Sequence, residues 1–519
     1  MNFDKQYPIG IQSFEKLRRG DCYYVDKTAE VWKLSRSLSP LFLSRPRRFG
    51  KSLLLSTLEA YFRGKRELFE GLAISHLEKE WKQYPVLHFD FNTVGSNDVG
   101  DLTGTLNQQL RRYEEACCIT SQESLTPQVR FMELIRKAAK GATQVVILID
   151  EYDKPLLNTI DDAGLQNEFR KILKPFYGAL KTMDRYIRFA MVTGVARFGK
   201  VSVFSDLNNL RDISLEPEFN AVCGITEEEL YSVFADSIEA LAKETDESVE
   251  AVRRQLKSNY DGYHFGDPGK CKDVYNPFSL ITAFANKRIG DYWFDSGTPT
   301  FLIKRMIRRD FSFNELNGTI VSADDLLCGI TADDSSVGQL FQTGYLTIKE
   351  YDRETDTYTV DFPNHEVEKG FDRLSLQAYS SMATSDFNIS KFRVEVIAGK
   401  PDDFMKRLQA FTADFPYDQI PDMEVHWHNV MYLLFKFLGF YARTEYKTSD
   451  GRIDAVVKTP RFIYVFEFKL DSSPEVALEQ INSKNYPLPF EADGRKLYRI
   501  GVEFTSKHRR IKAWKIVAD

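Results

Sequence analysis

The chain has 519 residues, of which 43% are hydrophobic and 28% are charged, and its net charge is −6. These proportions are typical of globular proteins and exclude a disordered or collagen-like chain, and the length predicts two to four domains of ~150 residues each. The apolar runs are shorter than the ~18 residues that cross a bilayer, and the first residues lack the pattern of a signal peptide. The six cysteines form no CxxC pair. We therefore expect a cytoplasmic protein with reduced thiols and no membrane partner.

The first half of the chain alternates strand-like apolar runs with helix-like amphipathic stretches. The predicted strands are 40–44, 85–91, 144–150 and 187–193, and the predicted helices are 53–61, most of 101–140, and 165–184. The run at 144–150, QVVILID, is almost entirely apolar, which is typical of a strand buried on both faces. The alternation predicts an α/β fold with a parallel sheet and right-handed crossovers.

A basic loop, RPRRFGKS, lies between the first strand and the first amphipathic helix. Phosphate-binding loops present backbone N–H groups and a helix N-terminus to the anion, with a lysine for the β- and γ-phosphates and a hydroxyl for Mg²⁺. Gly50, Lys51 and Ser52 supply these groups, whereas Arg45 stands where the usual pattern has its first glycine. The alternative is a basic helix entry without a ligand. The predicted nucleotide-loop residues are Arg45, Arg47, Arg48, Phe49, Gly50, Lys51, Ser52 and Leu53.

A second motif ends the apolar run at 144–150. In P-loop ATPases an acid in the place of Asp150 holds Mg²⁺, directly or through water, and one in the place of Glu151 polarises the attacking water. The alternative is a solvated strand end. Thr193, at the end of the next strand, is a candidate sensor of the γ-phosphate, and Arg197 is a candidate charge stabiliser. The alternative for these two is an ordinary strand end with a glycine turn.

The sequence changes character near residue 226. Amphipathic helical stretches begin at Thr226, a predicted N-cap, and the helical pattern continues to about residue 310. Residues 337–362 predict a helix followed by a strand, a turn and a strand, a pattern that suits a small winged-helix-like module.

The last hundred residues predict one more α/β unit. Its helices are expected at 424–438 and 474–484, and its strands at 441–446, 453–458, 462–468 and 497–504. Asp454 lies near one end of a hairpin, and Glu467 and Lys469 share a face of its other strand because they are two residues apart. Two carboxylates can hold Mg²⁺ for phosphodiester hydrolysis, and Lys469 can position or deprotonate the attacking water. The alternative is a solvated face.

Other residues extend this constellation. Glu424, at a helix start, is the candidate third carboxylate, and Glu445 on the following strand competes for that role. Gln480, on the later helix, would orient the site without touching the metal. His426 and His428 are more typical of a structural role than of a metal site, because no third His or Cys accompanies them.

Together these motifs resemble those of the AAA-ATPase-like bacterial proteins that carry a PD-(D/E)XK nuclease-superfamily domain at the C-terminus. The resemblance rests on FLSRPRRFGKSLLLSTLEAYF, VVILIDEYDKPL, VTGVARF, GRIDAVV, YVFEFK and ALEQINSKNY. It implies an AAA-like P-loop ATPase core at 1–225 and a restriction-endonuclease-like domain at 416–519, and the pattern of the residues between them predicts a helical lid and winged-helix-like region at 226–415. It also implies ATP and Mg²⁺ at Gly50, Lys51, Ser52, Asp150 and Glu151, and a nuclease centre, with Mg²⁺ or Mn²⁺, at Asp454, Glu467 and Lys469.

Two functions fit these predictions. One is an ATP-regulated nuclease acting on nucleic acid, with DNA as the expected substrate, and the other is a signalling-type regulatory ATPase whose nuclease-like domain only binds nucleic acid or a partner. Both allow a nucleotide-dependent homo-oligomer. Residues 421–519 carry 16 Lys and Arg against 13 Asp and Glu, so the acidic balance belongs to the rest of the chain. The basic stretch 495–515, with Lys507, Arg509 and Arg510, is either a contact for the phosphate backbone or a solvated tail.

Overall fold

The computed structural model describes residues 5–518 with several gaps, and it divides the chain into two compact units. The gaps are 96–97, 121–123, 140–142, 161, 197–208, 294–301, 304–305, 308–310, 312, 314–315, 317, 327–334, 380–388, 414–422, 438–440, 450 and 508–509. The N-terminal unit comprises Met1–Ser296 and Gly318–Val367, and the C-terminal unit comprises Gly297–Asn317 and Glu368–Asp519. None of the described helices is long and apolar enough to span a membrane.

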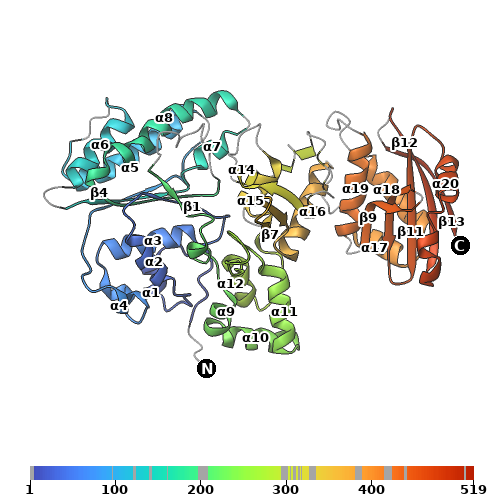
Figure 1. Ribbon diagram of the computed structural model, residues 1–519, viewed down its shortest axis with the longest axis horizontal. Coiled ribbons are helices and arrows are strands. Elements are labelled where there is room, and N and C mark those ends of the chain that lie inside the picture. The colour runs from blue at the N-terminus through green and yellow to red at the C-terminus, as the bar shows by residue number, and fades with distance from the viewer. Residues whose placement is uncertain are drawn as a thin grey trace. The chain divides into compact units, whose positions relative to one another are not determined.

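A five-stranded parallel sheet forms the centre of the N-terminal unit (Figure 1). Its strands are β1 (Leu41–Ser44), β2 (Val86–Asp90), β3 (Val145–Asp150), β4 (Ile187–Gly194) and β5 (Arg211–Asp212), in the order β2-β3-β4-β1-β5. The strands predicted at 40–44, 85–91, 144–150 and 187–193 are confirmed as β1 to β4. Because β3 lies inside the sheet and is covered on both faces, all its side chains are buried, which explains its unbroken apolar pattern.

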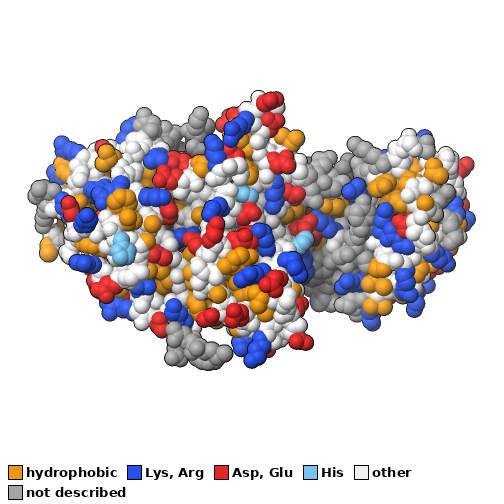
Figure 2. Space-filling model, turned by 60° about the horizontal axis from the view of Figure 1, so that its bottom comes forward, with side chains coloured by type: hydrophobic (Ala, Val, Ile, Leu, Met, Phe, Trp, Pro, Cys, Tyr) orange, Lys and Arg blue, Asp and Glu red, His pale blue; other side chains and the backbone are white. Residues whose placement is uncertain are grey.

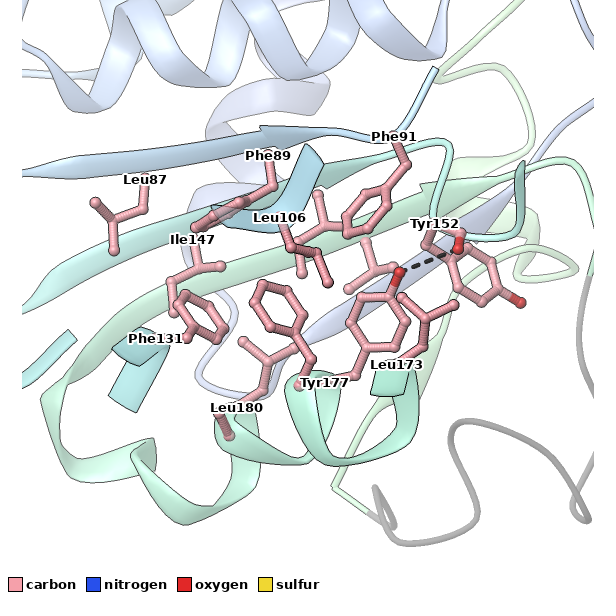
Figure 3. Close-up of a cluster of buried hydrophobic side chains, with 14 of the residues drawn as sticks. Leu87, Phe89, Phe91, Leu106, Phe131, Ile147, Tyr152, Leu173, Tyr177 and Leu180 are labelled. Carbon is pink, nitrogen blue, oxygen red and sulfur yellow. Dashed lines mark hydrogen bonds between the residues drawn. The ribbon is translucent and has the colours of Figure 1, made fainter. Parts of the chain in front are cut away.

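Helices cover both faces of this sheet (Figure 1). One face carries α5 (Val99–Ala116), α6 (Pro127–Ala138) and α8 (Ala163–Thr182), and the other carries α3 (Lys51–Phe62), beyond which lie α1 (Phe14–Arg19), α2 (Thr28–Ser35) and α4 (Ile74–Leu77). On the first face, Phe131 of α6 meets Phe89 of β2, with ring centres 5.0 Å apart (Figure 3). Phe176 of α8 stacks on Phe131 at 4.5 Å. Each such side chain, fully buried, stabilises the fold by roughly 1.5–3 kcal/mol.

A helical region and a small sheet complete the N-terminal unit. The helices are α9 (Glu227–Val233), α10 (Ala235–Thr245), α11 (Val249–Tyr260) and α12 (Pro277–Ala285). Thr226 caps α9 as predicted: its hydroxyl accepts from the Glu229 N–H, and the Glu229 carboxylate accepts from the Thr226 N–H. This reciprocal capping box marks where the sheet domain gives way to helices.

The small sheet has three antiparallel strands, β6 (Thr319–Ser322), β8 (Thr357–Asp361) and β7 (Thr347–Asp352), in that order. It is accompanied by α14 (Ala323–Leu326) and α15 (Ser336–Thr343). The helix, strand, turn and strand predicted at 337–362 correspond to α15, β7 and β8. The winged-helix assignment itself stays a prediction. Two further helices are α7 (Lys154–Asn158) and α16 (His365–Tyr379).

A mixed five-stranded sheet forms the centre of the C-terminal unit, in the order β13-β12-β11-β10-β9. Its elements are α17 (Ile389–Ile397), α18 (Pro401–Thr412), α19 (Met423–Phe437), β9 (Tyr441–Thr448), β10 (Gly451–Lys458), β11 (Phe462–Leu470), α20 (Pro474–Ser483), β12 (Lys496–Thr505) and β13 (Arg510–Ala518). β11 and β12 are parallel, and the other neighbours are antiparallel. All six elements predicted for this region are confirmed.

Strand β13 was not predicted, and it corrects the alternative of a solvated tail. Arg510 begins an edge strand that pairs with β12 from Tyr498 to Thr505. Arg510 and Lys512 are exposed and Ile511 between them is buried, but the pairing with β12 shifts register at Glu503 and Phe504, and Lys515 is again exposed. The exposed charged residues, without a regular alternation, give no strand signal in the sequence.

The close contact of α20 with β12 depends on the absence of a side chain at Gly501. A Cβ atom at this position would lie 2.3 Å from the Pro474 carbonyl oxygen and 3.1 Å from the Ala477 Cβ. Because the nearer atom is backbone, Gly501→Ala must push the helix away from the sheet. We expect a loss of about 1–3 kcal/mol in the free energy of unfolding of this unit, measured by urea titration.

Gly178→Ala, in the middle of α8, is the control for this substitution. Apart from its chain neighbours and the backbone of its own helix, no heavy atom lies within 4 Å of a Cβ at that position. The change should be neutral or should stabilise its helix by roughly 0.5–1 kcal/mol. Unchanged stability in Gly501→Ala would show that α20 does not pack on β12 in this way.

Candidate functional site

The basic loop between β1 and α3 makes its turn near its end rather than at its start. Gly50, directly before α3, has a φ of 94°, and Arg48 has a φ of 69°. Glycine adopts this left-handed conformation readily, whereas it costs an arginine about 1–2 kcal/mol. The Arg48 guanidinium lies 4.4 Å from the ring centre of Phe278, a cation–π contact that offsets part of this strain. The loop therefore closes without a glycine at position 45.

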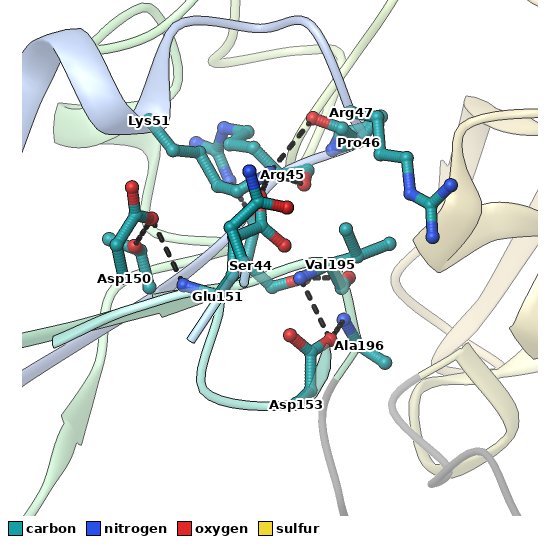
Figure 4. A network of polar contacts seen from close by, with 12 residues as sticks. Ser44, Arg45, Pro46, Arg47, Lys51, Asp150, Glu151, Asp153, Val195 and Ala196 are labelled. Carbon is teal, nitrogen blue, oxygen red and sulfur yellow. Dashed lines mark hydrogen bonds and ion pairs between the residues drawn. The ribbon is translucent and has the colours of Figure 1, made fainter. Parts of the chain in front are cut away.

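Lys51, the first residue of α3, points back into the loop (Figure 4). Its ammonium donates to the carbonyl oxygens of Arg45 at 3.0 Å and Pro46 at 3.2 Å, and lies 3.4 Å from Glu151 Oε1. The Lys51 side chain is only 3% exposed. The two carbonyls and the carboxylate replace the water that this charge has lost. A phosphate at the N-terminus of α3 would meet both this ammonium and the free N–H groups of the first turn.

Asp150 is the last residue of β3 and Glu151 follows it, and the neighbouring strand β4 orients Asp150. The Thr193 hydroxyl donates to Asp150 Oδ1 at 2.7 Å. The Glu151 N–H donates to the same oxygen at 3.0 Å (Figure 4). Glu151 has a φ of 52°, a strained conformation that is common at functional positions. The structure thus brings together three residues that the sequence predicted. Arg197 lies outside the described residues.

Asp153 is a buried residue of this site that the sequence reasoning missed. Its Oδ2 accepts from the N–H groups of Val195 at 2.9 Å and Ala196 at 2.6 Å (Figure 4). Burial, reinforced by the charge of Glu151, raises the pKa of this carboxyl to about 7. Asp153 ties the segment after β3 to the segment after β4. The signal in the sequence was the further acid in the motif DEYD.

An open cavity lies over the loop, with an empty volume of about 1220 Å³ that includes space open to solvent. The loop contributes Arg47, Arg48, Gly50, Lys51, Ser52 and Leu53 to its lining. Glu151, Lys154 and Asn92 also line it, and Asn92 was not expected from the sequence. Burial, followed by the nearby charge of Arg47, lowers the pKa of Lys154. The cavity is therefore rich in cationic groups, as an anion site requires.

A second, apolar cavity adjoins the first, because the two share Gly50, Leu53, Pro277 and Ile281 among their lining residues. Its empty volume is about 650 Å³. Its other walls are mostly apolar or aromatic, and they include Tyr23, Val25, Phe49, Val222, Ile225 and Phe234. The two cavities together offer a charged half and an apolar half on either side of Gly50.

Two predicted loop residues lie away from the polar cavity. Phe49 is buried against Tyr263 and Phe265, with ring centres at 4.7 and 5.5 Å, and it lines the apolar cavity instead. The Arg45 guanidinium is buried and lines neither of these two cavities. A direct contact of this side chain with phosphate, as the sequence suggested, does not fit this arrangement, because the guanidinium is buried and both of its terminal nitrogens donate to backbone carbonyl oxygens.

In the C-terminal unit, Asp454 on β10 and Glu467 on β11 lie one residue beyond the pairing of Ala455 with Phe466. Asp454 Oδ2 accepts from the Phe468 N–H at 2.7 Å. Lys469 Nζ donates to Glu467 Oε1 at 2.9 Å. The three predicted residues Asp454, Glu467 and Lys469 are thus brought together where the two strands pair.

Glu467 is only 1% exposed. Burial raises the pKa of its carboxyl to about 7, the charge of Asp454 adds to the shift, and the hydrogen bond from Lys469 opposes it. Its Oε2 is buried and has no hydrogen-bond partner among the described residues. An unpaired carboxylate oxygen beside a second carboxylate is the arrangement that a bound divalent cation would satisfy, so these residues fit Mg²⁺.

Gln480 on α20 supports the start of β10. Its Nε2 donates to the Tyr486 hydroxyl at 3.4 Å, and that hydroxyl donates to the Arg452 carbonyl oxygen at 2.8 Å. The structure therefore joins Gln480 to the backbone two residues before Asp454. This position suits a residue that orients the site from outside it.

The third carboxylate stays a prediction. Glu424 lies in α19 and Glu445 in β9, but their side chains, with those of His426 and His428, are outside the described part of the structure. Where side chains are described, no group of three or more His, Cys, Asp or Glu is arranged to hold a metal ion.

Several basic residues of the stretch 495–515 have acidic partners nearby. Arg495 pairs with Asp493, Lys512 Nζ lies 2.6 Å from Glu503 Oε1, and Lys515 Nζ lies 3.2 Å from Glu475 Oε1. Lys507 and Arg510 are exposed, and Arg509 is outside the described residues. On the face shown in Figure 2, basic and acidic side chains are interspersed over the N-terminal unit, without a large surface of one sign.

The fold and the two sites define a class: a P-loop ATPase-like domain and a PD-(D/E)XK nuclease-like domain in one chain. Residues 8–204 match the family model described as a predicted AAA-ATPase, and residues 422–514 match the PD-(D/E)XK nuclease superfamily. The chain is also 36% identical to an "Uncharacterized protein in vnfD 5'region" of Azotobacter chroococcum mcd 1, over 98% of both chains. The chain therefore belongs to the family that combines these two domains, as its motifs implied.

Two solved structures are also similar to parts of this chain. The Aeropyrum pernix ORC1 protein in complex with DNA is 12% identical, with a TM-score of 0.25 over 66% of this chain and 91% of that one. The Aeropyrum pernix ORC2 protein is 10% identical, with a TM-score of 0.18 over 70% and 93% of the two chains. Similarity at these TM-scores carries no argument about the site.

The raised pKa of Glu467 predicts a pH-dependent effect of Glu467→Gln on the stability of the metal-free C-terminal unit. The folded pKa of about 7 exceeds the ordinary value of 4.5, so the wild-type unit loses stability as pH rises from about 4.5 to 7. The neutral glutamine avoids this loss. We expect the variant to gain roughly 1–3 kcal/mol relative to wild type between pH 4.5 and pH 8, measured by urea unfolding in EDTA.

Glu475→Gln is the control, because it removes an exposed carboxylate of α20 whose pKa is lowered by hydrogen bonds within its own turn and to Lys515. This control should show no such gain with rising pH. A difference between Glu467→Gln and wild type that is the same at every pH would contradict the buried, unpaired state of Glu467.

Proposed function

We propose that the protein binds and hydrolyses ATP, and that this ATPase controls a Mg²⁺-dependent nuclease acting on nucleic acid, with DNA as the expected substrate. The observation that carries the proposal is the presence in one chain of the Lys51–Glu151 contact at the start of α3 and the Asp454–Glu467–Lys469 cluster. The first arrangement suits phosphoryl transfer from a nucleotide, and the second suits phosphodiester hydrolysis.

The adjoining cavities support ATP as the ligand. The polar cavity surrounds the N-terminus of α3 with Lys51, Ser52 and Glu151, where a triphosphate would lie. The apolar cavity, walled by aromatic residues such as Tyr23 and Phe234, suits a nucleobase. On binding, Lys51 would keep the two carbonyl partners that position it and direct its third donor to a phosphate oxygen.

The same geometry suggests roles in hydrolysis. Ser52 and Asp150 would hold Mg²⁺, which neutralises charge on the β- and γ-phosphates. Glu151, which lines the cavity, would orient the attacking water and accept its proton. Thr193 keeps Asp150 in place through its 2.7 Å hydrogen bond.

In the nuclease-like domain, Asp454 and Glu467 would hold Mg²⁺, or Mn²⁺ in its place, which stabilises the charge of a pentacovalent phosphate. The Phe468 N–H fixes one Asp454 oxygen, and the Lys469 ammonium lies 2.9 Å from Glu467 Oε1. Lys469 would orient or deprotonate the attacking water from this position. Gln480 would keep the start of β10 in place.

We propose as a second candidate a regulatory ATPase whose nuclease-like domain only binds nucleic acid or a partner. The exposed Lys507 and Arg510 suit contacts with a phosphate backbone, and such binding needs no cleavage. A nucleotide-dependent homo-oligomer in the cytoplasm is part of both proposals.

Nucleotide binding is tested with Lys51→Ala and Glu151→Gln in the full-length protein. Lys51→Ala should weaken ATP affinity by about tenfold or more, because it removes a charge-assisted contact with phosphate. Glu151→Gln should bind ATP but lose hydrolysis. Fluorescent-nucleotide titration and phosphate release measure the two effects. Lys171→Ala, which changes an exposed lysine of α8, is the control, and equal affinity of Lys51→Ala and this control would refute the ATP site.

Nuclease activity is tested on linear, circular and single-stranded DNA and on RNA, with Mg²⁺ or Mn²⁺, with and without ATP. We expect ATP-dependent cleavage by the wild type, a loss of about 100-fold or more in Asp454→Ala, and little cleavage by Lys51→Ala. Nucleic-acid binding without cleavage of any form, unchanged in Asp454→Ala, would favour the second candidate instead.

A further inference from the structure

Arg45 has surroundings that no other residue of the phosphate loop shares. It is 1% exposed, and its guanidinium donates to the carbonyl oxygens of Ser44 and Ser214, each at 2.8 Å. It also donates to those of Phe219 at 3.0 Å and Asn220 at 3.4 Å. The guanidinium carbon lies 4.1 Å from the ring centre of Phe265. One side chain thus joins the start of the loop to the chain segment 214–220.

The backbone of the same residue holds Lys51. The Arg45 carbonyl oxygen accepts from the Lys51 ammonium at 3.0 Å, and the Arg45 N–H donates to the Gly194 carbonyl oxygen at 3.2 Å. The peptide groups on both sides of Arg45 are therefore fixed, one by β4 and one by Lys51. The anchored side chain of Arg45 therefore decides whether the backbone at Arg45 and Pro46 keeps its orientation.

The loop has its left-handed residues at Arg48 and Gly50, so nothing in its first turn requires a glycine. What the first turn does require is a fixed direction for the carbonyl oxygens of Arg45 and Pro46, which accept from Lys51. A flexible glycine at position 45 would leave that direction open, whereas a planar guanidinium bound to several carbonyls restrains it. Burial lowers the pKa of Arg45 to about 10, so the group keeps its charge at neutral pH.

We propose that Arg45 is a positioning residue for nucleotide binding: it fixes the carbonyl groups that hold Lys51 by anchoring the loop to the chain segment 214–220. In the usual loop pattern the flexibility of a glycine shapes the first turn, and here the anchored side chain of Arg45 takes that part. The inference rests on the proposed ATP site, and it assigns to Arg45 an indirect role in place of a contact with phosphate.

The test is a double-mutant cycle on ATP affinity in the full-length protein, with Arg45→Gly, Lys51→Ala and the combination. Arg45→Gly restores the usual loop pattern, yet it should weaken ATP affinity by about tenfold or more, the equivalent of one charged hydrogen bond. Because Arg45 acts through Lys51, Lys51→Ala should cost a smaller factor in the Arg45→Gly background than in the wild type. A merely structural role would leave the two factors independent.

Arg130→Lys is the matched control, because Arg130 is also buried in the N-terminal unit, where it pairs with Glu114 at 2.7 Å. It should leave ATP affinity within about twofold of wild type, since it lies in a separate hydrogen-bond network. Arg45→Lys should give an intermediate loss, because one ammonium has fewer donors than a guanidinium. Should Arg45→Gly fail to fold, this variant carries the test.

Wild-type ATP affinity in Arg45→Gly or Arg45→Lys would overturn the inference and leave the ATP site intact. The inference would also be overturned if Lys51→Ala reduced ATP affinity by the same factor in the Arg45→Gly background as in the wild type. A wild-type protein that binds no ATP would overturn both the inference and the proposed function.

Discussion

The ammonium group of Lys51 is almost completely withdrawn from water, and the arrangement around the nucleotide loop follows from this constraint. A buried charge needs partners of opposite polarity, and here they are the carbonyl oxygens of Arg45 and Pro46 and the carboxylate of Glu151. The carbonyls must point inward, and Glu151 must leave the strand in a strained conformation to reach the lysine. The remaining contacts of the site keep these partners in place.

The two sites treat their carboxylates in different ways. Asp150 accepts from Thr193 and from the Glu151 N–H, so its orientation is determined before any ligand arrives. Glu467 has one buried oxygen without a partner among the described residues, and its neighbour Asp454 disfavours its ionised form. The first site is oriented in advance, whereas the second holds an unfavourable charge that a cation would relieve.

Much of this architecture follows directly from sequence patterns. The unbroken apolar run at 144–150 predicts a strand buried on both faces, and the spacing of Glu467 and Lys469 places them on one side of β11. Such patterns record periodicity within one helix or strand. They predict the burial of a residue correctly where that residue's own element determines which way it faces. The family motifs then determine which charged residues belong to each site.

The rest depends on contacts between distant segments, which periodicity does not record. Arg45 looked like a phosphate ligand because its neighbours are basic, but carbonyl oxygens from segment 214–220 surround its guanidinium. Asp153 was missed because nothing in the sequence shows that it accepts from backbone N–H groups beyond β4. β13 was missed because its exposed positions carry charges that suggested a tail.

The contact between Trp293 and the nucleotide loop has a consequence for how the protein is made. The Trp293 indole N–H donates to the Arg47 carbonyl oxygen at 3.3 Å, across a separation of 246 residues. At ribosomal speeds of about 5–20 residues per second, the loop therefore waits roughly 10–50 s for this partner after its own synthesis. During that interval the sheet can form while the loop lacks part of its support. The growing chain thus passes through a stage in which its parallel sheet is already synthesised and the Arg47 carbonyl still lacks this hydrogen bond.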